Sequence, residues 1–144
     1  KIQVTGRTKS YINAFGEELI RDNAEKALES ACRKTGAVIR EYTAAPIFMD
    51  ENGKGGHEWL IEFETAPKNL KEFSELLDEK LKEVNSDYEA KRHKDLALRP
   101  PLVRSVPEGT FYQWMKKRGK LGGQNKIQRL SNDRRLVDDI LNLR

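Results

Sequence analysis

The sequence contains little of what several common classes of protein require. One cysteine and two histidines occur among its 144 residues, so an internal disulfide is impossible. No run approaches the ~18 consecutive apolar residues that a membrane-spanning helix needs, and the N-terminus lacks the basic-then-apolar layout of a signal peptide. We therefore expect a cytoplasmic protein with no membrane partner. The apolar neighbourhood of Cys32 is typical of a small buried side chain rather than of a reactive thiol.

Sequence patterns for self-contained catalysis are absent as well. His57 opens an apolar stretch and His93 lies in a charged one, with no second ligand at zinc spacing near either, so we expect no metal site. No serine or cysteine elbow accompanies them as the nucleophile of a triad. The phosphate-binding patterns GxxxxGK[ST] and GxGxxG do not occur. The chain is therefore expected to contribute at most part of a nucleotide site.

The composition is that of one globular domain with a well-solvated surface. Hydrophobic residues make up 37% and charged residues 35%, with five prolines and ten glycines. A chain of this length buries roughly two thirds of its unfolded surface, which is enough for an independent core. The first residue is Lys1 rather than methionine, and an apolar-alternating stretch follows at once. We interpret the sequence as a piece of a longer protein.

Periodicity of the apolar residues predicts an α+β fold, with a small mixed β-sheet and amphipathic helices packed against it. The strand at 57–64 alternates apolar and acidic residues, so one buried face is expected, with Glu58, Glu62 and Glu64 in solvent. The polar, glycine-rich stretch 50–56 is typical of the connection in an antiparallel pair. The expected elements, in chain order, are extended segments at 1–5 and 10–14, a helix from Asp22 or Asn23 to Gly36, strands at 38–42 and 57–64, helices from Asn69 and at 86–94, a strand at 102–106, a helix from Thr110 to near Gly119 and a last helix around 136–141.

A basic segment leaves more than one function open. Residues 104–129 hold seven lysine and arginine residues against Glu108 alone. Such a segment can bind nucleic acid, the phosphates of a nucleotide or an acidic protein surface. Tyr112 and Trp114 could stack on bases, as in single-strand binding proteins. Trp114 shares a helical face with Phe111 and Met115, however, and such a face is more typical of core packing.

Two groups of motifs are more specific. Residues 6–19 read GRTKSYINAFGEEL and precede the first predicted helix. This order resembles the hinge motif of the adenylate-forming superfamily, which includes acyl-CoA synthetases and luciferases: a GR-x-[DK] turn, an isoleucine in a strand, then a glycine-containing loop before a helix. The stretches VPEGTF (106–111) and GGQNKIQRL (122–130), together with GHEWLIEFE (56–64), resemble the auxin-responsive acyl-acid amido synthetases of plants and their bacterial relatives. A bacterial relative is the member that we expect.

The resemblance implies a domain organisation and an activity. Residues 1–144 would form a single C-terminal lid domain with its hinge near 6–10, without the large N-terminal adenylation body. Members of this family use ATP and Mg²⁺ to convert a carboxylic acid to an acyl adenylate, and an amino acid amine then displaces AMP. The parent would be an ATP-dependent ligase that forms carbon–nitrogen amide bonds. This domain alone would bind no cofactor and be inactive, and its partners would be its own adenylation domain and the acid and amino acid substrates, not nucleic acid.

The resemblance also assigns roles to residues. A lysine ammonium near the α-phosphate lowers the barrier to adenylation, and Lys126 is the candidate, although the PxxxxGK pattern of acyl-CoA synthetases is replaced here by GGQNK. The other implied residues are Arg7, Gln124 and Asn125 for the nucleotide, Gly6 and Lys9 for the hinge, and Asn13, Phe15, Gly16 and Glu17 for a loop that faces the second substrate. Two alternatives remain: a basic α+β module that binds RNA or an acidic partner, and a standalone interaction or regulatory domain.

Overall fold

A computed structural model describes residues 11–48, 54–93, 98–117 and 127–143. Its strands form two sheets, a two-stranded antiparallel ribbon of order β1-β2 and a three-stranded sheet of order β3-β4-β5. The elements, in chain order, are β1 (Tyr11–Ile12), β2 (Leu19–Ile20), α1 (Arg21–Thr35), β3 (Val38–Ile47), β4 (Gly56–Thr65), α2 (Leu70–Val84), α3 (Ser86–Arg92), β5 (Leu102–Val106), α4 (Thr110–Lys117) and α5 (Arg135–Leu141).

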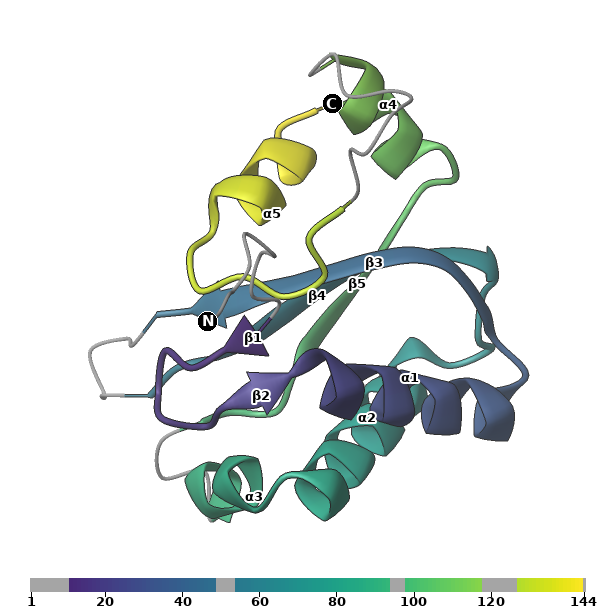
Figure 1. Cartoon of the computed structure of the whole chain (residues 1–144). Helices are drawn as coiled ribbons and strands as arrows, with labels where there is room; N and C mark the ends of the chain where they lie inside the picture. Colours follow the sequence, from purple (N-terminus) through teal and green to yellow (C-terminus); the bar gives the residue numbers. More distant parts are fainter. Residues whose placement is uncertain (1–10, 49–53, 94–97, 118–126, 144) are drawn as a thin grey trace, which may run out of the picture.

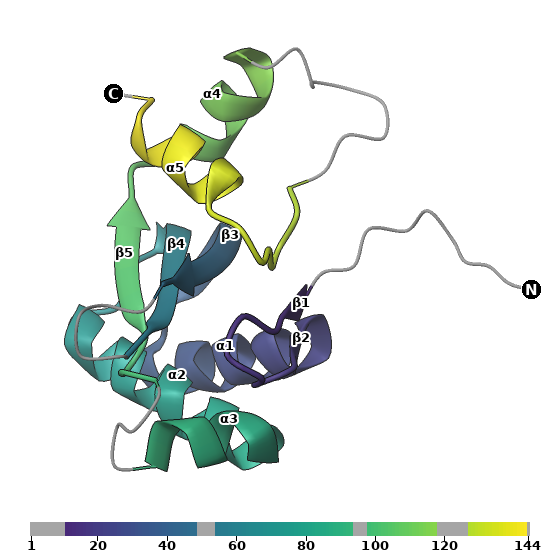
Figure 2. The ribbon, with the colours of Figure 1, turned by 90° about the vertical axis from the view of Figure 1, so that its left-hand side faces the viewer.

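The larger sheet is mixed and covered on both faces. β4 lies in its centre, antiparallel to β3 and parallel to β5. Figure 1 shows α1 and α2 on one side of this sheet and α4 and α5 on the other, and Figure 2 shows the same layers from the side. The predicted α+β class, the mixed sheet and the antiparallel pairing of the two long strands are confirmed.

The larger core lies between the sheet and α1 and α2. Helix α1 presents small side chains at helical spacing, namely Ala24, Ala27 and Ala31, all fully buried. It begins at Arg21, slightly earlier than the sequence predicts, because Asn23 sits one turn inside and accepts the Ile20 N–H at 3.1 Å. Gly36 ends the helix with a φ of +80°, a conformation that favours glycine.

Helix α2 follows the sequence prediction closely. The Asn69 side chain accepts the Glu72 N–H at 3.0 Å, which caps the helix start. Phe73 and Leu77 are fully buried, and Phe73 meets Phe63 of β4 edge to face at 5.3 Å between ring centroids. Asn85 then separates α2 from α3 and caps α3, since its side chain accepts the Tyr88 N–H at 2.8 Å.

The expectation of one buried face on β4 is wrong. Glu58 and Glu62 are 3% and 1% exposed, whereas Glu64 near the strand end is exposed. The reason is a second apolar core on the face where solvent was expected. It consists of Ala45, Leu60, Phe111, Ile127, Val137 and Ile140, and it joins α4 and α5 to the sheet.

Buried Glu62 is satisfied by the start of α4. Its carboxylate accepts the Gly109 N–H at 2.9 Å and the Phe111 N–H at 3.1 Å, and Arg40 Nε lies 3.6 Å from it. The expected cap, Thr110, is instead the first helical residue and donates its hydroxyl to the Pro107 carbonyl at 2.6 Å. A side chain from the central strand therefore caps this helix and supplies the negative charge that a helix N-terminus favours.

Three further features of the described residues bear on function. None of their helices is both long and apolar enough to cross a membrane. The same residues contain no group of three or more His, Cys, Asp or Glu side chains that could hold a metal ion. Cys32 is half-buried beside the larger core, and this burial raises the pKa of its thiol.

Replacement of Glu62 tests the cap of α4. We expect Glu62→Ala to lower the free energy of unfolding by about 2 to 4 kcal/mol, because two buried N–H groups lose their acceptor. Urea unfolding of the variant and the unsubstituted chain measures this change. Glu64→Ala, on the exposed end of the same strand, should change it by less than about 0.5 kcal/mol. Equal effects of the two substitutions would contradict the assignment.

Candidate functional site

Six of the residues assigned roles from the sequence lie outside the described residues. The six are Gly6, Arg7 and Lys9 near the N-terminus and Gln124, Asn125 and Lys126 before Ile127. The structure does describe the parts of the chain that follow these two groups, namely the β1–β2 turn and the segment 127–132. The roles of the six residues stay predictions, and the residues next to them define the candidate site.

The expected second-substrate loop is the turn between β1 and β2. The Asn13 side chain accepts the Glu18 N–H at 3.0 Å, and the Asn13 carbonyl accepts the Gly16 N–H at 3.3 Å. Gly16 has a φ of +82° and Glu18 one of +43°, so the backbone is left-handed on both sides of Glu17. Left-handed backbone is costly for a residue with a side chain, which means that the surrounding contacts hold this turn in shape.

The four loop residues differ in exposure. Asn13 and Gly16 are exposed and Phe15 is partly buried, whereas Glu17 is 0% exposed. The Glu17 Oε2 atom lies 2.6 Å from Nε2 of His57, a residue of β4 that is itself 2% exposed. Sequence reasoning assigned His57 no function, and the only signal was a polar residue at the start of an apolar strand. Glu17 therefore faces the protein interior, and of the other three residues only Asn13 and Gly16 are exposed.

A glycine makes room for the Phe15 side chain. A Cβ atom at Gly55 would lie 2.3 Å from Phe15 Cζ and 2.9 Å from the Ile47 carbonyl oxygen, so no other residue fits there without movement of the turn or of β3. The Phe15 ring also lies 6.3 Å from the His57 ring, centroid to centroid. The turn is thus packed against β4 through an aromatic side chain as well as through Glu17.

Two asparagines secure the other end of the turn. Asn85 Nδ2 donates to the Glu18 carbonyl at 3.0 Å and to Asn23 Oδ1 at 3.1 Å, and Asn23 Nδ2 donates to the Val84 carbonyl at 3.3 Å. These amides form the floor of an open hollow of about 520 Å³ beside the turn. Because the amides are engaged with the main chain, their role is to join the turn to the junction of α2 and α3.

The segment that follows Lys126 runs beside β3. The Ala44 N–H donates to the Arg129 carbonyl at 2.8 Å, and the Ala44 carbonyl accepts the Ser131 N–H at 3.1 Å. The Thr43 hydroxyl donates to the Gln128 carbonyl at 2.6 Å, and Ile127 is 7% exposed. Two backbone bonds, one hydroxyl and one buried side chain therefore fix this segment to the sheet immediately after the predicted lysine.

Arg129, the arginine of the GGQNKIQRL motif, is part of this anchor. Its guanidinium donates to the Tyr42 carbonyl at 2.7 Å, pairs with Glu41 at 2.8 Å and lies 4.8 Å from the centroid of the Tyr42 ring. Burial and the hydrogen bond to Glu25 raise the pKa of Tyr42, although the positive charge of Arg129 opposes this rise. The arginine is thereby occupied within the domain.

Asn132 joins the two segments that the sequence singles out. Its Oδ1 accepts the Asn13 N–H at 2.7 Å, and its Nδ2 donates to the Tyr11 carbonyl at 3.3 Å. Figures 1 and 2 show the yellow segment before α5 passing beside β3 towards β1. The turn after β1 and the segment after Lys126, 119 residues apart at the Asn13–Asn132 contact, thus meet at one edge of the fold. We take this edge as the candidate functional site.

An ion cluster holds α5 against the sheet next to this edge. Glu58 pairs with Arg134 at 2.7 Å and with Arg104, while Arg134 also donates to the Pro46 carbonyl at 3.0 Å and to Asp138 at 2.9 Å. Burial by itself raises the pKa of Glu58, but the hydrogen bonds from Arg134 and Arg104 outweigh it and leave that pKa below its usual range. The cluster is structural, because its charges are matched internally.

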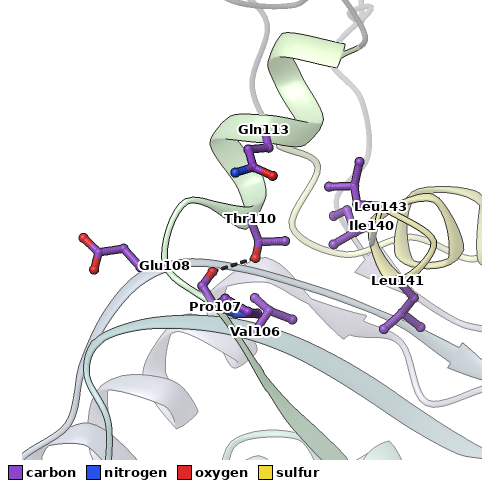
Figure 3. A pocket seen from close by; sticks show the side chains of 8 residues that line it. All are labelled: Val106, Pro107, Glu108, Thr110, Gln113, Ile140, Leu141 and Leu143. Atoms are coloured by element: carbon purple, nitrogen blue, oxygen red, sulfur yellow. Dashed lines mark hydrogen bonds between the residues drawn. The ribbon is translucent and has the colours of Figure 1, made fainter.

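A small hollow between α4 and α5 has little reactive chemistry. It encloses about 140 Å³ and is lined largely by apolar side chains, including Val106, Ile140 and Leu141. Figure 3 shows the Thr110 hydroxyl bonded to Pro107 and the Glu108 carboxylate pointing away from the hollow. No residue of the β1–β2 ribbon or of the segment 127–132 lines it, and α4 and α5 lie on the opposite side of the large sheet from that ribbon (Figure 1), so the hollow is separate from the candidate site.

Comparison with solved structures gives the class of the fold. The GH3.15 acyl acid amido synthetase matches 94% of this chain with a TM-score of 0.71 and 18% sequence identity. The AtGH3.15 acyl acid amido synthetase in complex with 2,4-DB matches the same share with a TM-score of 0.67 and 17% identity. At these identities the likeness shows a shared fold. The chain spans 26% of the length of each of these structures.

The sequence itself gives the family. The family model of the GH3 family C-terminal domain matches residues 22–135, which is most of the chain. The chain therefore belongs to the GH3 family as its C-terminal domain, and the resemblance to acyl-acid amido synthetases drawn from the three motif stretches is confirmed. A search of curated protein sequences gave no significant match.

The Glu58 cluster predicts a pH dependence of stability. Because the pKa of Glu58 is lower in the folded state, its contribution is present above the unfolded-state pKa of about 4.3 and is lost as pH falls through the folded-state value. We expect the unfolding free energy to fall below about pH 4, and to fall less steeply in Glu58→Gln than in the unsubstituted chain. Urea unfolding at pH 3 to 7 measures both slopes. Glu75→Gln, on the surface of α2, should keep the full slope, and an unchanged slope in Glu58→Gln would refute the prediction.

Proposed function

We propose that this chain is the mobile C-terminal lid of an ATP-dependent acyl-acid amido synthetase, which works on substrates held mainly by an N-terminal adenylation domain. Membership of the GH3 C-terminal domains and the names of the structural relatives support this function. The observation that carries it is the contact of Asn132 with Asn13 and Tyr11. This contact brings together, at one edge of the domain, the two segments that the two half-reactions require.

In the first half-reaction a carboxylate oxygen attacks the α-phosphorus of ATP and pyrophosphate leaves. Negative charge grows on the phosphate oxygens, so an ammonium group fixed near them stabilises the transition state. Lys126 is the residue proposed for this role, with Arg7, Gln124 and Asn125 near the nucleotide. The attachment of residues 127–132 along β3 supports the proposal, because it fixes the chain that directly follows this lysine.

In the second half-reaction the amine of an amino acid attacks the acyl carbonyl, loses a proton and displaces AMP. The β1–β2 turn is proposed to face this step, with Asn13 and Gly16 on its exposed side, Phe15 partly buried against β4, and Glu17 supporting the turn from within. Gly6 and Lys9 precede the turn and serve as the hinge about which the lid rotates relative to the adenylation domain between the two steps. ATP and Mg²⁺ act as substrates of the full-length protein, in the cytoplasm, and this domain alone is inactive.

The alternative of a nucleic-acid module draws less support from the described residues. Phe111 is fully buried and Trp114 packs against the second core, so neither is a stacking platform. Arg104 and Arg129 are paired with acidic side chains of the sheet. Tyr112 is exposed, but among the described residues of the basic segment it is a single exposed ring, which offers little surface for base stacking.

Substitution of Lys126 tests its part in adenylation. In the full-length protein that contains this chain, we expect Lys126→Ala to lower ATP/pyrophosphate exchange by well over about tenfold, because the developing charge loses its ammonium partner. The assay uses a panel of small carboxylic acids, and circular dichroism confirms that the variant is folded. Lys120→Ala, a second lysine of the same basic segment, should stay within about twofold of the unsubstituted protein. Unchanged exchange in Lys126→Ala would remove the assignment.

A further inference from the structure

His57 and Glu17 form a buried pair that the proposed chemistry leaves without a role. The His57 Nε2 and Glu17 Oε2 atoms lie 2.6 Å apart, and their side chains are 2% and 0% exposed. Buried polar groups are costly unless they are paired. We therefore expect this pair to fix the conformation of the two segments that carry it. One member comes from the central strand and the other from the β1–β2 turn, 40 residues earlier.

The Glu17 carboxylate contacts the backbone of the turn as well as the His57 side chain. The second carboxylate oxygen of Glu17, Oε1, accepts the Phe15 N–H at 2.8 Å. The carboxylate therefore bridges His57 to the main chain of the turn, and its orientation is fixed at both oxygens. Because Glu18, which carries a side chain, is held at a φ of +43° directly after Glu17, the turn depends on such contacts to keep its shape.

The His57 ring is itself held by a rigid part of the fold. Its centroid lies 6.3 Å from that of the Phe15 ring and 5.8 Å from that of the Tyr88 ring, with an interplanar angle of 20° to the Tyr88 ring. The Tyr88 hydroxyl donates to Asp78 at 2.7 Å, and Arg92 donates to both oxygens of that carboxylate at 2.9 and 2.6 Å. A continuous chain of buried contacts thus runs from α2 and α3 through His57 to the turn.

We propose that His57 is a positioning residue for amide formation: through the Glu17 carboxylate it holds the Asn13–Glu17 turn in the conformation that the second half-reaction uses. This inference rests on the proposed function and deepens it. Adenylation depends on Lys126 at the other segment, so a change at His57 affects the two half-reactions unequally. Displacement of a substrate-facing loop by an ångström is enough to slow a reaction by orders of magnitude.

The test compares the half-reactions in the full-length protein that contains this chain. ATP/pyrophosphate exchange reports adenylation, and amide product formed from the same acid and a saturating amino acid reports the complete reaction. In His57→Leu, which removes the hydrogen bond, we expect amide formation to fall by about tenfold or more while exchange stays within about twofold. In His57→Gln, which keeps an N–H donor for Glu17, we expect amide formation to return to within about threefold of the unsubstituted protein.

Glu62→Gln is the matched control. It alters another buried polar side chain of β4, but one that contacts the start of α4 and not the β1–β2 turn, so both half-reactions should keep their ratio. If His57→Leu does not fold because Glu17 is left unpaired, the double variant Glu17→Gln and His57→Leu removes that charge while keeping an acceptor for the Phe15 N–H. The same imbalance is expected from it.

Three results would overturn the inference. Exchange and amide formation could fall by the same factor in the His57 variants, they could both remain within about twofold, or His57→Gln could be as impaired as His57→Leu. Absence of exchange in the unsubstituted protein would overturn the proposed function, and this inference with it. Loss of the imbalance alone would leave the proposed function in place.

Discussion

A charged or polar side chain can be buried only if it finds partners, and this requirement organises the domain around β4. The strand carries three such side chains. His57 pairs with Glu17 of the β1–β2 turn, Glu58 with Arg104 and Arg134, and Glu62 with backbone N–H groups at the start of α4. Each buried group therefore binds a different distant segment, and the central strand sets where the turn, α5 and α4 lie.

Local patterns were sufficient for most elements of the fold. Asn69 and Glu72 marked the start of α2, and the apolar spacing of 136–141 marked α5, because a cap and a helical stripe are properties of neighbouring residues. The burial of Glu58 and Glu62 could not be predicted in this way. Alternation on a strand indicates a solvent-exposed face unless other elements cover it. Here the covering side chains come from residues 111 to 140, far along the chain. The Arg134 that pairs with Glu58 is 76 residues away.

The sequence indicates which segments make up the candidate site, but not how these segments contact one another. The order of the motifs identified the family, since glycine turns and a lysine-bearing loop are visible in sequence. The Asn13–Asn132 contact joins residues 119 positions apart, and no spacing rule reveals it. The resemblance implies that Glu17 belongs to a loop facing the second substrate, yet its carboxylate is buried and contacts His57 and the Phe15 N–H. Tertiary contacts of this kind decide which loop residues face a substrate and which support the loop.

The most direct test of the account is the formation of an amide by the full-length protein, with and without this domain. Purified protein is supplied with ATP, Mg²⁺ and mixtures of small carboxylic acids and amino acids, and the products are analysed by mass spectrometry. We expect an acid–amino acid conjugate together with AMP from the full-length protein, and no conjugate from residues 1–144 alone or from the remainder alone. Conjugate formation that persists after removal of residues 1–144, or its absence with every acid from the full-length protein, would contradict it.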